Sequence, residues 1–179
     1  ARQVFCRVPD DVRVVMHCGS VSTYEPAKKL LHDYGMVPVR YFWTMRVDLA
    51  EPLTRPILPP GMIIKTFAEV DDLTAVVTAN SEAFQDHWGY VAQPVAETVK
   101  LWQDWLANDT KFDASLWFLA IAGDEIIGMS LCRLEAHNDP TWGWVDDLAV
   151  KRAWRRQGVA LALLHHSFAE LHARGKKTI

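Results

Sequence analysis

The stretch Trp142–Arg174, WGWVDDLAVKRAWRRQGVALALLHHSFAELHAR, predicts an apolar strand joined to an amphipathic helix by a short turn. Arg155, Arg156, Gln157 and Gly158 lie where the strand has ended and the helix begins. Backbone N–H groups at a helix start have no partner within the helix, and the helix dipole is positive there. Gly158 has no Cβ, so it permits a positive φ or a close approach of a ligand to the main chain. The join therefore predicts an anion site of the kind that holds a phosphate.

The composition narrows the classes of protein that such a site can belong to. A chain of 179 residues with 50% hydrophobic residues is long enough to bury a core and favours one domain. Its formal net charge of −3 argues against a protein that coats nucleic acid, because affinity for a polyanion normally requires a basic excess. No apolar run reaches the roughly 18 to 20 residues that span a bilayer, and the amino terminus lacks the order of a signal peptide. We expect no nucleic-acid partner and no membrane partner.

The cysteines and histidines favour a reducing compartment and no metal. Cys6, Cys18 and Cys132 are odd in number, widely spaced and in no CxxC pair, so no disulfide is expected. The adjacent His165 and His166 have no partner at the i, i+4 spacing that a metal site on one helix face needs. The chain is therefore expected to be cytoplasmic and to hold no metal.

A proline-rich stretch divides the chain unequally. Residues 51–61, EPLTRPILPPG, hold four prolines, which remove backbone donors and forbid helix, and so predict a linker. Within residues 1–50, the pattern predicts a strand at Val12–Met16, a helix at Glu25–Tyr34 and a strand at Val37–Val47. This β-α-β piece has few residues for a core of its own.

Residues 62–179, after the linker, predict a sheet with helices beside it. Leu116–Ala122 and Glu125–Leu134 flank a short Gly123-Asp124 turn and predict a hairpin, with Trp142–Val150 as a third strand. The other expected elements are a strand at Met62–Phe67, a helix at Asp71–Phe84 capped by Asp71 or Asp72, a helix at Ala96–Leu106, a last helix that ends at Arg174, and the start of a strand at Lys176–Ile179. Trp102 and Trp105 are expected on one buried helical face.

The turn and the elements around it resemble those of the GCN5-related N-acetyltransferase (GNAT) superfamily. The residues RRQGVA, Arg155 to Ala160, match its Q/R-x-x-G-x-G/A signature. The signature follows a strand ending in Leu148–Val150 and opens a helix, as in the family, and Gly128 lies where family members often carry glycine. The resemblance covers Met62 to the end. It implies an α/β (α+β) fold class: the GNAT fold, with a mixed, mostly antiparallel central sheet flanked by helices and the phosphate-binding helix after the fourth strand.

The resemblance extends to residues 1–50, which have the order of the β-α-β-β tail of a GNAT module. Gly35 ends the helix there, and Met36 stands in place of the usual aromatic residue. Tandem GNAT proteins of the mycothiol synthase type carry such a tail before the body of a second module. Two arrangements are open: the tail completes the fold of residues 62–179, or the chain is a fragment. The first is favoured, because a GNAT sheet cut after its third helix would expose a hydrophobic strand edge. Exchange of the tail between two chains would give a homodimer.

The resemblance implies acyl transfer from acetyl-CoA to a primary amine of a small molecule, by direct attack in a ternary complex. In the family the pantetheine arm pairs with the strand before the turn, and the turn and helix start hold the pyrophosphate. Carried over to this sequence, the residues that contact acetyl-CoA are Leu148, Ala149, Val150, Arg155, Arg156, Gln157, Gly158, Val159 and Ala160.

Three carboxylates are candidates for the general base. An alkylamine has a pKa of about 10.4, so a proton must leave it before attack at neutral pH. Asp146 and Asp147 lie on the strand beside the expected carbonyl, and strand alternation would send their side chains to opposite faces. Asp146 is preferred, Asp147 is second, and Glu135 on the adjacent strand is third. The general acid is open, because Leu31 stands where many GNATs carry a tyrosine.

Acceptor selection is expected from the loop around Phe84, His87 and Trp88, with Trp142 and Trp144 lining the same cleft. These aromatic residues favour an apolar or amphipathic acceptor. Two other classes of function stay open. A catalytically inactive regulatory or structural module of a tandem protein would bind CoA without turnover. Another kind of nucleotide-binding domain would be protected by ATP where CoA gives no protection.

Overall fold

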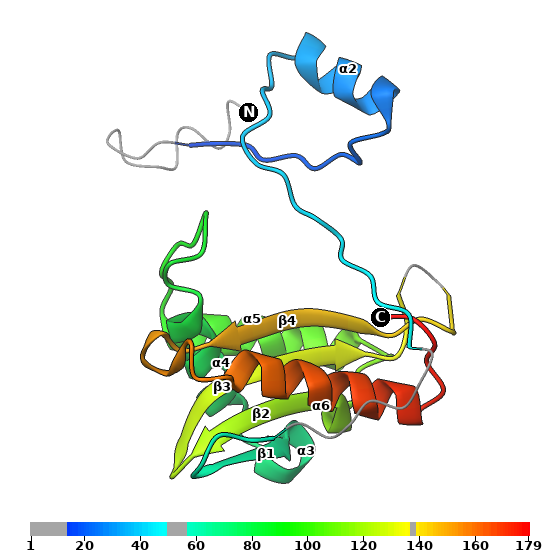
Figure 1. Ribbon diagram of the computed structural model, residues 1–179. Helices are drawn as coiled ribbons and strands as arrows, with labels where there is room; N and C mark the ends of the chain where they lie inside the picture. The colour runs from blue at the N-terminus through cyan, green and yellow to red at the C-terminus, as the bar shows by residue number, and fades with distance from the viewer. Residues whose placement is uncertain (1–13, 50–56, 137–138) are drawn as a thin grey trace. The chain divides into compact units, whose positions relative to one another are not determined.

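The chain forms two compact units, one that runs up to Thr44 and one that is Met45–Ile179. A computed structural model describes residues 14–49, 57–136 and 139–179 (Figure 1). Residues 1–13, with Cys6 and the first two residues of the strand expected at Val12–Met16, lie outside the described residues. So do residues 51–56 of the expected linker.

The first unit contains one helix among its described residues, α2 (Glu25–Asp33). None of the side chains of α2 is buried. Val14–Met16 and Val37–Thr44, where strands were expected, form no ladder in the described chain. A strand needs a second extended segment to pair with its backbone N–H and C=O groups. The helix α2 has no buried face, so it does not pack on these segments and hold them together.

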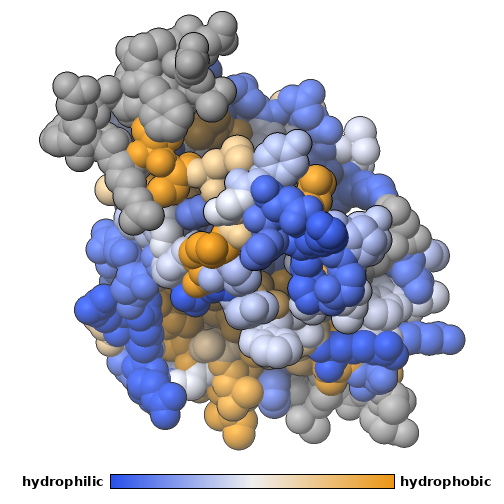
Figure 2. Space-filling view, turned by 90° about the horizontal axis from the view of Figure 1, so that it is seen from above, coloured by the Kyte–Doolittle hydropathy of each residue, from blue (hydrophilic) through white to orange (hydrophobic). Residues whose placement is uncertain are grey.

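Large apolar side chains of the first unit are exposed. Phe42 is 69% exposed and Trp43 is 86% exposed. Figure 2 shows hydrophobic surface beside hydrophilic surface on the face seen from above. That residues 1–50 complete the fold of the body stays a prediction.

The second unit is built on an antiparallel sheet in the order β1-β2-β3-β4. Its strands are β1 (Met62–Thr66), β2 (Trp117–Ala122), β3 (Glu125–Arg133) and β4 (Trp144–Val150). Gly123, with a φ of 58°, and Asp124 form the turn between β2 and β3 that the sequence predicted. β4 lies at one edge of the described sheet, so one side of its backbone is open to another extended chain.

Helices cover both faces of this sheet: Figure 1 shows α6 in front of it and α4 and α5 behind it. The helices are α3 (Phe67–Val70), α4 (Leu73–Ala83), α5 (Val95–Asn108) and α6 (Val159–Ala173), with single 3₁₀ turns at Ala114–Leu116 and Arg152–Trp154. Asp72 caps α4 by accepting a hydrogen bond of 2.9 Å from the N–H of Ala75, whereas Asp71 ends the short, unexpected helix α3. Because α6 follows the fourth strand, this is the fold class that the resemblance implied.

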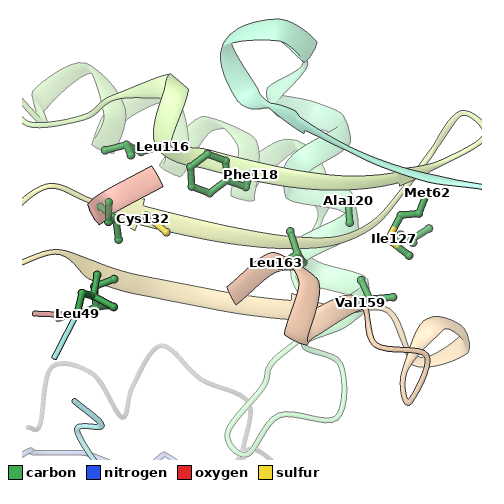
Figure 3. Packing of buried hydrophobic residues seen from close by; sticks show 11 residues of the cluster. Leu49, Met62, Leu116, Phe118, Ala120, Ile127, Cys132, Val159 and Leu163 are labelled. Atoms are coloured by element: carbon green, nitrogen blue, oxygen red, sulfur yellow. The ribbon is translucent and has the colours of Figure 1, made fainter. Parts of the chain in front are cut away.

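The core has two layers, one on each face of the sheet. Phe118, Ile127 and Leu163 are fully buried between the sheet and α6, and Figure 3 shows this cluster from close by. Val76 and Leu119 are fully buried on the other face, against α4. Each such side chain contributes about 1.5–3 kcal/mol through burial. The two layers therefore fix the end of β4 and the start of α6 relative to each other.

The last residues of the chain add a short extended segment to the second unit, beside the residues that precede β4. Lys177–Ile179 lie between residues 141–143 and 47–49. Val47 and Ile179 exchange two backbone hydrogen bonds of 2.8 and 2.9 Å, and the bridge to the residues before β4 is parallel. The start of a strand expected at the chain end is thus formed, and the pairing is mixed. No helix of the described residues has both the length and the apolarity to cross a membrane.

Candidate functional site

A cleft of about 680 Å³ opens where β4 ends and α6 begins, and the end of α4 with the loop after it forms its other wall. Its lining residues are Ala83, Phe84, Asp86, His87, Leu148, Ala149, Val150, Trp154, Arg155, Arg156, Gly158, Val159, Ala160 and Leu161. All the residues expected to contact acetyl-CoA line this cleft except Gln157. The cleft therefore joins the strand end and the turn that the sequence singled out.

The turn before α6 has an unusual backbone. Arg156 and Gly158 both adopt positive φ, of 63° and 85°. A Cβ at Gly158 would meet only Pro59, at 3.9 Å, so glycine is needed there for its φ rather than for space. Gly158 is the N-cap of α6 and no side chain caps this helix, which leaves its first N–H groups open to an anion. The side chain of Gln157 donates to the carbonyl of Ala153 at 3.0 Å and so stabilises the turn.

The two arginines of the turn have different environments. Arg155 donates through Nε to the carbonyl of Val150 and through Nη2 to the carbonyl of Ala83. It also forms a bidentate ion pair with Asp86, whose pKa it holds well below the usual range. Arg156 makes no side-chain hydrogen bond or ion pair within the described chain and is exposed. Arg156 is therefore the arginine with donors to offer a ligand.

Gly128 lets three segments approach one another beside the cleft. A Cβ there would lie 2.9 Å from the carbonyl oxygen of Ala149 and 3.2 Å from methyl groups of Val150 and Val159. Because its φ is not positive, glycine is needed here for space. Its absent side chain allows β3 to lie close to β4 and to the first turn of α6, which are two walls of the cleft.

A β-bulge changes the arrangement of the two aspartates on β4. Leu131 pairs with Asp147 and Cys132 pairs with Val145, so Asp146 is the extra residue of the bulge. Asp146 and Asp147 line the same cavity, and the prediction that alternation sends them to opposite faces is wrong. An inserted residue breaks the period of two on which that prediction depended.

The three candidate carboxylates differ in their partners. Asp146 is ion-paired with Arg133, which also binds Asp109 at 2.8 Å. Glu135, beyond the end of β3, is ion-paired with Lys111.

Asp147 forms no ion pair or side-chain hydrogen bond within the part of the chain that the structure describes. Burial raises the pKa of Asp147, and the neighbouring charge of Asp146 raises it further, while His87 opposes the rise. Asp147 is thus the carboxylate whose oxygens are available to another group, and its raised pKa brings it closer to the range of a working base.

The cavity beside these aspartates measures about 280 Å³. It lies between α5 and the sheet, and its lining residues are Leu101, Trp102, Trp105, Trp117, Leu131, Asp146 and Asp147. The rings of Trp105 and Trp117 are stacked with centroids 6.2 Å apart, and the guanidinium of Arg133 lies 4.9 Å from the centre of the Trp105 ring. Trp105 is 43% exposed, so the expectation of a buried tryptophan face holds only in part.

The residues expected on the acceptor side separate into two groups. Phe84 and His87 line the cleft, with ring centroids 5.5 Å apart, whereas Trp88 does not line it. Trp142 and Trp144 lie at or before the start of β4, at the opposite end from the cleft. At about 3.3 Å per strand residue, Trp144 is roughly 13 Å from Leu148. The structure does not bring these two tryptophans to the cleft.

No group of three or more residues able to hold a metal occurs within the described ranges. His166 packs its ring edge against Phe118, with centroids 4.7 Å apart.

The strand, turn and helix that form the cleft are matched by a known family. A family model described as the Acetyltransferase (GNAT) family matches residues 74–179, more than half of the chain. The chain belongs to the GNAT family. The matched residues include all of β4, the turn and α6.

Curated relatives and solved structures of GNAT proteins agree with this. The chain is 28% identical to the mycothiol acetyltransferase of Thermobispora bispora over 153 residues, which are 83% of this chain and 50% of that protein. It is 29% identical to the mycothiol acetyltransferase of Saccharopolyspora erythraea over 170 residues, 93% of this chain and 53% of that protein. The chain spans about half the length of these curated relatives.

The crystal structure of a GCN5-related N-acetyltransferase from Sphaerobacter thermophilus is similar to the present structure, with a TM-score of 0.66 and 29% sequence identity. The similarity covers 88% of this chain and 46% of that one.

Sequence reasoning missed two groups of residues in this GNAT site. Asp86 lies in the loop NSEAFQDHWG, but nothing local indicates that it pairs with Arg155. The spacing of Trp102 and Trp105 predicts a core position, and only the packing of α5 against the sheet brings them beside Asp147. Both groups depend on contacts between segments far apart in the chain.

Proposed function

We propose that this GNAT chain is an acyl-CoA-dependent N-acyltransferase that moves acetyl from acetyl-CoA to a primary amine of a small molecule by direct attack in a ternary complex. The observation that carries the proposal is the cleft at the end of β4. One continuous hollow joins an open strand edge, an uncapped helix start with a free arginine, and the aromatic pair Phe84 and His87. A carboxylate with no partner in the described chain, Asp147, precedes that strand end directly.

The donor would lie along β4 and the turn. The N–H groups of the first turn of α6 and the guanidinium of Arg156 would hold the pyrophosphate, and a charge-assisted hydrogen bond contributes about 1.5–3 kcal/mol. The backbone of Leu148, Ala149 and Val150, at the sheet edge, would pair with the amides of the pantetheine arm. In this arrangement the thioester would lie beside the carboxyl-terminal half of β4.

The reaction then needs a base, and the structure supports Asp147 over Asp146. The amine nitrogen attacks the thioester carbonyl and its proton passes to the base. The carbon–sulfur bond then breaks, and the CoA thiolate takes a proton from the protonated base or from water and leaves as a thiol. Asp146 is engaged in an ion pair with Arg133, whereas Asp147 has no such partner in the described chain and has a raised pKa. A backbone N–H of β4 directed at the carbonyl would stabilise the oxyanion.

The acceptor would enter through the cavity between α5 and β4. Trp102 and Trp105 offer aromatic rings, and Asp146 and Asp147 offer negative charge, in one hollow of about 280 Å³. Such a wall favours a cationic amine with an apolar body, because an ammonium group is attracted both to carboxylates and to the face of an indole ring. The proposal therefore retains the apolar or amphipathic acceptor expected from the sequence and keeps Phe84 and His87 among the residues that would contact it. Trp102 and Trp105 replace Trp142 and Trp144.

A thiol-release assay with acetyl-CoA and a panel of primary amines tests the proposal. We expect amine-dependent release of CoA, with the acetylated amine detected by mass spectrometry. Asp147→Asn should abolish most of the turnover and leave CoA binding intact, while Asp146→Asn should retain more activity. A matched control is Asp124→Asn, in the hairpin turn, because Asp124 lines neither the cleft nor the cavity. Full activity in Asp147→Asn would refute its assignment as the base.

A second function, a CoA-binding module without catalysis, is favoured by one observation, the leucine at position 31 where many GNATs carry a tyrosine. The same assay separates the two functions. Saturable CoA binding with no acetylated product for any amine would support the module without catalysis.

A further inference from the structure

Arg155 joins three separate segments that all border the cleft. Its Nε donates to the carbonyl of Val150 at 3.0 Å, at the end of β4. Its Nη2 donates to the carbonyl of Ala83 at 2.9 Å, at the end of α4. Both Nη atoms donate to the carboxylate of Asp86, at 2.5 and 2.9 Å, in the loop after α4. With most of its donors used in this way, Arg155 has little left to offer a phosphate.

Asp86 belongs to the short loop that carries the acceptor-side residues. The N–H of His87 donates to the carbonyl of Phe84 at 2.8 Å, so this loop is a tight turn with Asp86 inside it. Phe84 and His87 both line the cleft on either side of Asp86. Arg152 adds a second contact to the same carboxylate, at 3.1 Å. The position of Asp86 therefore fixes the position of the two aromatic rings.

We propose that the Arg155–Asp86 pair is a positioning latch, which couples the occupancy of the donor turn to the geometry of the acceptor loop. The latch rests on the proposed function in two respects: the turn takes CoA, and the loop with Phe84 and His87 contacts the amine. Arg155 begins the turn that would close on the pyrophosphate, and its side chain reaches the loop that would contact the amine. Binding of the donor orders the turn, and through the Arg155–Asp86 pair it also orders the loop with Phe84 and His87. Because such coupling is reciprocal, binding of the acceptor to the loop strengthens binding of the donor to the turn. Arg155 and Asp86 are positioning residues, and neither needs to touch a substrate.

The competing assignment makes Arg155 a direct ligand of the pyrophosphate. The two assignments differ in what they predict for Asp86→Asn. If Arg155 binds phosphate directly, the loss of Asp86 frees the guanidinium and removes a nearby negative charge, so CoA binds as well as before or better. If Arg155 is a latch, the variant keeps a donor site of similar affinity and loses the coupling.

Hydrogen–deuterium exchange with CoA as the probe tests the latch without requiring turnover. In the wild-type chain, CoA should slow exchange both at the start of α6 and in the loop that contains the N–H groups of His87 and Tyr90. In Asp86→Asn, CoA should still slow exchange at the start of α6, but its slowing of exchange in the loop should be smaller by about fivefold or more. A factor of about five is the low end of the coupling usually found between two sites. Asp86→Glu, which keeps a carboxylate, should restore at least half of it. Asp124→Asn is the matched control and should behave as the wild type.

Each outcome decides between the assignments. Loop slowing that persists in Asp86→Asn, or that is absent from the wild type, overturns the latch and leaves the donor site standing. CoA that slows exchange in neither segment overturns the donor site itself, and the latch with it. Where Asp86→Asn does not fold, Arg155→Lys replaces it, because a lysine cannot reproduce the bidentate pair and the two carbonyl contacts.

Steady-state kinetics give a second measurement, which would not change if the Arg155–Asp86 pair only stabilised the fold. With an amine that turns over, Asp86→Asn should raise the KM of the acceptor about fivefold or more and change the dissociation constant of CoA less than the KM. An equal loss of donor affinity and acceptor affinity, or a loss of donor affinity alone, would contradict the latch.

Discussion

Gly128→Ala tests how closely the walls of the donor site are packed. The new Cβ would lie 2.9 Å from the carbonyl oxygen of Ala149 and 3.2 Å from Cγ2 of Val150 and Cγ1 of Val159, where ordinary contacts are 3.4–4 Å. The oxygen belongs to the backbone of β4 and cannot rotate away. β4, or α6 with its Val159, must therefore shift by a few tenths of an ångström.

The cost of this shift can be bounded. Overpacking a close-packed site costs about 1–3 kcal/mol, while replacing glycine by alanine within a strand returns about 0.5–1 kcal/mol of backbone entropy. The net loss therefore lies between about 0 and about 2.5 kcal/mol, with a centre near about 1 kcal/mol, and a loss of that size lowers the Tm of a unit of this size by roughly 4 °C. Because both displaced segments line the cleft, the affinity for CoA should fall as well.

Thermal unfolding followed by circular dichroism, with and without CoA, measures both effects. Gly19→Ala is the control, because a Cβ at Gly19 has nothing within 4 Å and its φ is not positive. The control should melt as the wild type does. A Gly128→Ala variant that melts at the wild-type temperature or above, with unchanged stabilisation by CoA, would refute the close approach of β3, β4 and α6.

Three further predictions concern single residues. Burial raises the pKa of Asp147 above the ordinary value of 3.8 for an aspartate. Ionisation of Asp147 therefore destabilises the folded chain increasingly as the pH rises from about 3.8 to the raised pKa, and the loss persists above it. Asp147→Asn should therefore raise the Tm at pH 7, and this gain in Tm should vanish below about pH 4. The same variant should lower turnover about 10²- to 10⁴-fold. A lower Tm than that of the wild type at pH 7 would contradict the burial of this carboxylate. Arg156→Gly should relieve the strain of a positive φ, leaving the ligand-free chain at least as stable, and weaken CoA binding about tenfold or more in titration calorimetry; unchanged affinity would count against a phosphate contact. Burial raises the pKa of the Cys132 thiol, so native alkylation followed by mass spectrometry should modify the exposed Cys18 and spare Cys132; rapid loss of the Cys132 thiol would show that the core opens.

The elements of the second unit were predictable because their signals are local. The Gly123-Asp124 turn, the Asp72 cap and the positive φ of Gly158 each depend on neighbours within a few residues. The prediction of an anion site rests on the same kind of signal, since a glycine at the N-cap has no side chain to accept from the first N–H groups of the helix. These positions predicted the hairpin, the start of α4 and the turn that borders the cleft, and binding of the donor in that cleft stays a prediction.

The acceptor side was less predictable because it depends on pairing between distant segments. The bulge at Asp146 exists only in the register of β4 against β3, and no property of the pair Asp146-Asp147 indicates it. The contact of Arg155 with Asp86 likewise joins two loops, so the sequence treated both arginines of the turn alike. Trp144 was placed in the cleft from its residue type, although its distance along β4 excludes it.

The strand expected at Val37–Val47 shows the limit of composition. Its apolar residues satisfy the pattern of a strand, and its last residue, Val47, exchanges backbone hydrogen bonds with Ile179, whereas residues 37–44 form no ladder within the described chain. A strand forms only when a second segment pairs with it, and the residue pattern of one segment does not show whether such a pairing segment is present.

A crystal structure of the chain with acetyl-CoA tests the central claim most directly. We predict the pyrophosphate against the N–H groups of the first turn of α6 and the guanidinium of Arg156, with Arg155 still paired to Asp86. The thioester carbonyl should lie beside the end of β4, within reach of Asp147 directly or through one water. Acetyl-CoA bound elsewhere, or a pyrophosphate held by Arg155 in place of Asp86, would contradict the account.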